Sequence, residues 1–184
     1  LLISFEIFSS FVDNAPAMPT LLLNFGDIAA ASARAGRWLM ETTLSGKFVS
    51  FGATFTHDDG LGGALTSLVT QVHTHTLIKD VLVDLPGRDP VLDFLANSNG
   101  ILKVFESHGL DSLVTDQSAL VTLVPNGSSG GVDHYYIDVP NTAGMLYLTV
   151  PDPYNGSKAV QGASRADGKV LPLSNVWFGR TGMT

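Results

Sequence analysis

The chain has 184 residues, a formal net charge of −7 at pH 7 and no cysteine. This length suits one domain with a single buried core. The acidic balance, without any cluster of Lys and Arg, argues against direct binding of nucleic acid. The lack of cysteine excludes disulfides, thiolate catalysis and zinc–cysteine sites.

Charged residues make up 15% of the chain, against about 25% in typical soluble domains, whereas the apolar fraction of 45% is ordinary. The shortage of charge must therefore fall mostly on the surface. Extensive subunit contacts would produce such a surface, because the centres of interfaces are depleted in charge. A surface of Ser, Thr, Asn and Gly, as in many secreted β-proteins, is the alternative interpretation.

Residues 1–19 are predicted to form an N-terminal extension or arm with a linker, followed by a single β-rich domain over residues 20–184. Ile3, Phe5 and Ile7 alternate with other residues, which predicts a strand. Such a strand can pair with a neighbouring sheet edge or within its own domain. The segment carries an acidic residue and no basic region, so we expect neither a signal peptide nor a membrane span.

The next residues suggest a short apolar strand at 20–25 and then the best helical pattern in the chain, at 28–42 with Asp27 as its cap. A second, short helix is predicted at 90–96, where Asp89 would cap it and Pro90 would occupy its first position.

Alternation of apolar residues predicts strands at 47–56, 77–85 and 101–106. Residues 64–76 are ambiguous, because their apolar spacing suits a helix and their Thr and Val content suits a strand.

Three further β-rich runs are predicted at 119–124, 132–139 and 144–150, separated by Gly, Pro, Asn and Ser. Trp177 is expected to anchor the C-terminal end against the core. The expected fold is therefore mainly β with one or two helices, in a single-domain β-sandwich, jelly-roll-like or barrel core.

The histidines suggest one ordered arrangement. His73 and His75 are followed after four residues by Asp80 and after six more by Gly87, and a later strand contains His134. This spacing resembles the two motifs of the cupin superfamily, over roughly residues 70–150. The resemblance implies a small β-barrel in which His73, His75, Asp80 and His134 hold one divalent transition metal, for which imidazole and carboxylate ligands are suitable. Asp80 stands where the family has Glu. The alternative is that these residues are polar positions of exposed strands and loops.

Other chemical signatures are missing. The chain has no Gly-x-Ser-x-Gly elbow, phosphate loop or dinucleotide fingerprint. Aromatic side chains could stack on sugar rings or serve as core and interface anchors. The residues concerned are Tyr135, Tyr136, Tyr147, Tyr154 and Trp177.

These features favour a non-enzymatic structural subunit of a large homo-oligomeric or multi-protein assembly of the capsid, decoration or filament type, located in a virion or an extracellular assembly. Its expected partners are copies of itself and other assembly proteins. The alternative is a cupin-like divalent-metal-binding β-barrel, which could be an enzyme.

Overall fold

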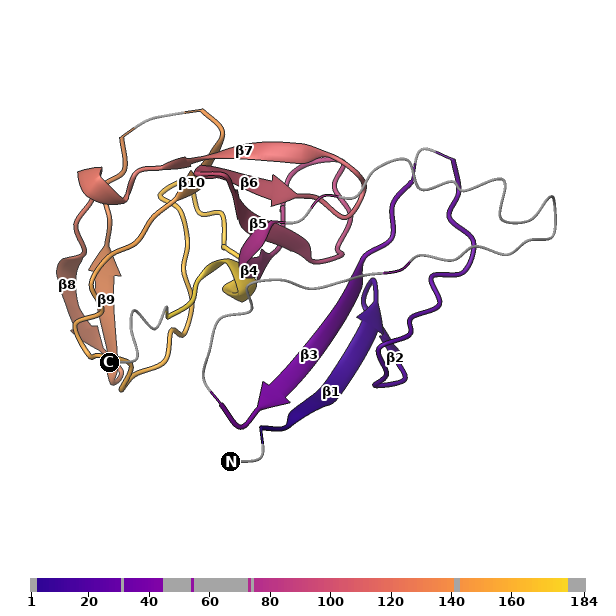
Figure 1. Ribbon diagram of the computed structural model, residues 1–184. Helices are drawn as coiled ribbons and strands as arrows, with labels where there is room; N and C mark the ends of the chain where they lie inside the picture. Colours follow the sequence, from indigo (N-terminus) through magenta and orange to yellow (C-terminus); the bar gives the residue numbers. More distant parts are fainter. Residues whose placement is uncertain are drawn as a thin grey trace, which may run out of the picture.

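The computed structural model describes residues 3–30, 32–44, 54, 73, 75–140 and 143–178. These residues form ten strands in three sheets and two short 3₁₀ turns, and none of them lies in an α-helix. The protein is thus mainly β, as the sequence predicts, with curled sheets that form a half-barrel (Figure 1). This architecture is consistent with a β-sandwich or barrel core.

The N-terminal sheet has three antiparallel strands in the order β2-β1-β3. They are β1 (Phe5–Val12), β2 (Ala15–Ala17) and β3 (Gly36–Thr42). The strand expected near the N-terminus is confirmed, and β1 pairs within its own chain from Phe5 opposite Thr42 to Val12 opposite Gly36. This sheet extends away from the half-barrel (Figure 1).

The helix predicted at 28–42 is wrong, because its second half is strand β3. Pairing along the whole of β1 supplies the backbone hydrogen bonds that a helix would have made internally. Gly36 at the start of β3 also lets the ring of Phe25 pack closely against the strand, since a Cβ at this position would lie 2.7 Å from that ring. The strand predicted at 20–25 is wrong as well, for these residues are irregular and cover β3 instead.

The half-barrel is a five-stranded sheet in the order β10-β7-β6-β5-β4. Strands β4 to β7 form an antiparallel meander, and β10 pairs with β7 in parallel. The strands are β4 (Thr76–Val81), β5 (Asp93–Ser98), β6 (Ile101–Phe105), β7 (Asp111–Asp116) and β10 (Met145–Tyr147).

Strands at 77–85, 101–106 and 144–150 are confirmed with shorter bounds. The helix predicted at 90–96 is wrong, because β5 occupies most of it. Asn99 and Gly100 form the two-residue turn that joins β5 to β6, and their φ angles of 54° and 88° suit such a turn. This hairpin places Leu95 in the core, and its burial outweighs the helical signal of Asp89 and Pro90.

The third sheet is a hairpin of β8 (Val124–Ser129) and β9 (Val132–Tyr136). The strand at 132–139 is confirmed, but the strand predicted at 119–124 is wrong. The turn η2 (Ser118–Leu120) occupies its beginning, and β8 runs through the Pro, Asn, Gly and Ser residues that were assigned to a turn. The prediction at 47–56 and most of that at 64–76 lie outside the described residues.

The hydrophobic core formed by the described residues is small. Its fully buried centre is Val81, Val83, Leu95 and Val104, and Tyr147 and Trp177 are among the partly buried residues that pack against it. The rings of Tyr147 and Trp177 lie 6.2 Å apart, which confirms the predicted anchoring of the C-terminal segment.

The same segment contains the turn η3 (Leu173–Asn175), which lies beside β4. Asn175 accepts a hydrogen bond from the backbone N–H of Leu82 at 2.7 Å and donates one to its carbonyl at 2.8 Å. It therefore satisfies both backbone groups just beyond the end of β4, as a pairing strand would. Within the described part of the chain, no helix has the length and apolar character required to cross a membrane.

Candidate functional site

The residues predicted to bind a metal fall into three places. The rings of His73 and His75 stack with centroids 6.2 Å apart, and His75 also stacks on Phe105. Asp80 on β4 accepts a hydrogen bond from Arg37 at 3.0 Å. His134 lies on the exposed hairpin, with its Nε2 2.8 Å from the hydroxyl of Ser129.

The structure thus brings His73 and His75 together just before β4. Asp80 and His134 have other partners. The separation follows from topology, because β4 and β9 belong to different sheets. Among the described residues, no group of three or more His, Asp or Glu side chains is placed to hold a metal ion. The metal site stays a prediction.

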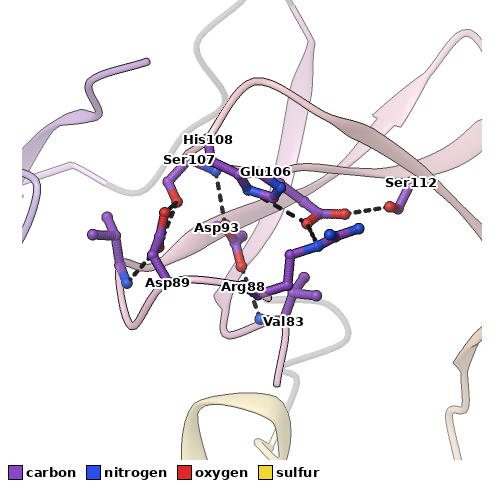
Figure 2. A network of polar contacts seen from close by, with 9 residues as sticks. Val83, Arg88, Asp89, Asp93, Glu106, Ser107, His108 and Ser112 are labelled. Carbon is purple, nitrogen blue, oxygen red and sulfur yellow. Dashed lines mark hydrogen bonds and ion pairs between the residues drawn. The ribbon is translucent and has the colours of Figure 1, made fainter. Parts of the chain in front are cut away.

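A network of buried polar groups joins the loop after β4 to the turn after β6 (Figure 2). Its centre is Asp93, which is 3% exposed at the start of β5. One carboxylate oxygen accepts the backbone N–H of Val83 and the other accepts that of Ser107, both at 2.8 Å. Charged acceptors make strong hydrogen bonds, so Asp93 fixes these two backbone segments to each other.

Glu106 is the second buried carboxylate of this network, and its side chain is inaccessible to solvent. Its Oε2 lies 2.6 Å from Nε of Arg88 and 3.6 Å from Nδ1 of His108, while its other oxygen accepts the hydroxyl of Ser112. A buried carboxylate needs a counter-charge and hydrogen bonds. Arg88 supplies the charge and Ser112 a hydrogen bond to one oxygen, while Oε2 makes the ion pair without a hydrogen bond of good geometry among the described residues.

Ser107 is the one nucleophile-type side chain at the centre of the network. Its hydroxyl donates to Asp89, with Oγ–O distances of 2.9 and 3.1 Å, and Asp89 also accepts the N–H of Val91. The neighbouring imidazole of His108 is directed at Glu106, as Figure 2 shows. In activated serines the hydroxyl usually donates to an imidazole, whereas here it donates to a carboxylate that also holds the backbone N–H of Val91. We call this network of Asp93, Glu106 and their partners a structural latch, because it joins two backbone segments.

A cavity of about 290 Å³ lies between the N-terminal segment and this latch. Polar residues on its wall include Asp13, Arg34, Asp89 and Ser107, and Asp13 is paired with Arg34 at 2.9 Å. Small-molecule sites are typically lined by apolar and aromatic side chains around a few polar groups. None of the described residues on its wall is aromatic, so this part of its lining does not resemble that of such a site.

A polar cluster that the sequence did not suggest lies between the β8–β9 hairpin and the C-terminal loop. The hydroxyl of Tyr154 donates to Asp133 at 2.6 Å and accepts from Tyr135 at 2.9 Å. The amine of Lys158 bonds Asp133 and lies 4.1 Å from the centre of the Tyr154 ring. Because its members are up to 25 residues apart, no local motif reveals the cluster.

These contacts determine the protonation of the cluster. Hydrogen bonds from Lys158, then Ser128 and Tyr154, hold the pKa of Asp133 well below its usual value of 3.8. The hydrogen bond to Asp133, followed by that from Tyr135, raises the pKa of the Tyr154 hydroxyl well above its usual value of 10.0. Tyr154 therefore keeps its proton at neutral pH, and the cluster serves to tie the C-terminal loop to the hairpin.

Large apolar side chains are exposed on the N-terminal sheet and on the loop between β2 and β3. Phe8 on β1 is 73% exposed and Leu22 is 83% exposed. Others with substantial exposure are Met18, Leu21, Ile28, Trp38, Leu39, Met40 and Leu44. Exposed apolar residues also occur elsewhere, for example Leu113 at 68% and Val170 at 71%, but those near the N-terminal sheet come from strands and loops that the sheet brings together.

A comparison of the chain with protein-family models, curated protein sequences and solved structures finds no significant match.

Proposed function

We propose that the protein is a non-enzymatic structural subunit of a homo-oligomeric or multi-protein assembly, of the capsid, decoration or filament type. The observation that carries the proposal is the exposed apolar side chains of the N-terminal sheet and of the loop between β2 and β3, represented by Phe8, Met40 and Leu22. Exposed apolar surface that forms a patch is typical of protein–protein contacts. The low charge of the chain agrees with extensive subunit contacts.

The energy available from this surface is comparable with the cost of association. Complete burial of one large apolar side chain contributes about 1.5–3 kcal/mol. Five such side chains would contribute roughly 7.5–15 kcal/mol, and association costs about 4–15 kcal/mol. A partner must therefore cover most of the exposed apolar residues of the N-terminal sheet for the complex to be stable.

The polar groups of the interior support a structural role. Asp93 holds two backbone N–H groups, and Glu106 is neutralised by Arg88. Both carboxylates thus serve the fold of the half-barrel.

Light scattering coupled to size-exclusion chromatography tests the proposal. The full chain should elute as an oligomer at micromolar concentration, and Phe8→Asp should shift it towards the monomer. The matched control is Leu120→Asp, at a 65% exposed leucine on the turn η2 outside the N-terminal sheet, which should leave the mass unchanged. A wild-type chain that stays monomeric throughout this range would contradict the proposal.

A further inference from the structure

The two edges of the N-terminal sheet differ in how they are protected. At one edge, β2 has three residues and contains Pro16, which has no backbone N–H to donate. At the other edge, β3 has seven residues, Gly36–Thr42, with neither proline nor lysine. Natural proteins usually shield a long edge strand by such residues or by covering it.

Within the part of the chain that the structure describes, no strand pairs with the outer edge of β3. Its central residues Trp38, Leu39 and Met40 are also between 38% and 45% exposed, and the segment at 20–25 reaches them through the hydrogen bond from the Trp38 indole N–H to the carbonyl of Thr20. Among the described residues, β3 therefore has no strand partner on this edge and presents apolar side chains beside it, which is the combination used when one chain adds a strand to another.

The sequence of β3 is complementary to itself. In an antiparallel pair of two copies centred on Leu39, the residue numbers of opposite positions sum to 78. Leu39 then lies opposite Leu39, Trp38 opposite Met40, and Arg37 opposite Glu41. Both ends of the pair thus match a positive with a negative side chain, and its centre is apolar, as cross-strand pairing favours.

The charges around Glu41 agree with this register. Inside the subunit, the residue opposite Glu41 on β1 is Glu6, so two like charges face each other. An incoming Arg37 on the other side of Glu41 would offset this repulsion. Arg37 bonds Asp80 through Nη1 and stacks on Phe11, yet its guanidinium has five N–H donors and can hold a second carboxylate.

We propose that two copies of the chain associate by antiparallel pairing of their β3 strands about a two-fold axis at Leu39, which joins two three-stranded sheets into one of six. This inference rests on the proposed function, since it names one contact of that assembly. A two-fold contact needs the same surface on both subunits, which the palindromic charge pattern of β3 supplies.

Disulfide trapping in the full chain tests the register, because the wild-type chain has no cysteine. Under mild oxidation Leu39→Cys should give a covalent dimer. Trp38→Cys and Met40→Cys should cross-link faster when mixed than either does alone, because directly opposite positions are about 4.5–5.5 Å apart and diagonal ones about 7–8 Å. Leu120→Cys is the exposed control. If Leu39→Cys forms no more dimer than this control, the strand pairing is wrong.

A charge reversal gives a second readout that does not depend on cysteine. Glu41→Lys places like charges opposite Arg37 at both ends of the pair and should raise the dimer dissociation constant on the order of tenfold. The control Glu6→Lys changes the same charge on the inner strand and should have a smaller effect. Equal effects of the two variants would overturn the proposal.

These experiments distinguish failure of the β3 pairing from failure of the assembly function. An oligomer that neither Leu39→Cys traps nor Glu41→Lys weakens would retain the assembly function and refute pairing through β3. A strictly monomeric chain would refute both.

Discussion

Replacing Asp93 by Ala should strongly destabilise the half-barrel. The side chain is buried and accepts the N–H groups of Val83 and Ser107, each at 2.8 Å. Truncation leaves two buried donors without partners, at about 1–3 kcal/mol each, so the expected loss in free energy of unfolding is roughly 2–6 kcal/mol. This is a large part of the 5–15 kcal/mol typical of a domain.

Urea denaturation followed by circular dichroism measures this loss. Asp93→Asn should be intermediate, because the amide oxygen can accept only on one side while its NH₂ group faces the second donor. Asp111→Ala is a matched control on the same sheet, since its half-exposed carboxylate lies 3.8 Å from Lys103, and it should change stability by less than about 0.5 kcal/mol. A loss below about 1 kcal/mol for Asp93→Ala would refute the latch.

Three other predictions address the core, the sheet edge and the C-terminal loop. Leu95→Ala should lower the free energy of unfolding by about 2–5 kcal/mol in the same assay, and a smaller loss would mean that Leu95 is not in a packed core. Asn175→Ala should speed amide exchange at Leu82, whose N–H it binds, and unchanged exchange would contradict the edge contact. Because the folded-state pKa of Asp133 is lowered, its stabilising contribution is present above the ordinary value of 3.8 and is lost as pH falls below it. Carboxyl NMR titration should show this depressed pKa, and Lys158→Met should raise it; an ordinary pKa in the wild-type chain would contradict the cluster.

The sequence predicted the β character and several strands because alternation and turn residues agree there. For 101–106 the alternating pattern predicts a strand and the Gly-containing break at 97–100 predicts its beginning, but the hairpin with β5 was not predicted. At 28–42 and 90–96 the capping signals were local, whereas the outcome depended on pairing with distant strands, which overrides helix propensity.

The polar sites were less accessible to sequence reasoning. Asp93 accepts hydrogen bonds from backbone N–H groups 10 and 14 residues away. Because nearly every residue type has a backbone N–H, the sequence does not reveal which residues donate. The cluster around Asp133 depends on how the C-terminal loop returns to the hairpin. By contrast, the low charge of the chain is visible in the sequence at once, and under the proposed function it agrees with an N-terminal sheet that contacts other subunits.

The central claim is that the N-terminal sheet is a contact surface between subunits. Hydrogen–deuterium exchange of peptides covering 36–42, measured over a range of protein concentrations, tests it most directly, because pairing protects the edge amides of β3. Protection should rise with concentration in step with the mass from light scattering, while peptides from β6 stay unchanged. Exchange in 36–42 that stays constant while the mass rises would refute pairing through β3, and a mass that also stays constant would contradict the central claim.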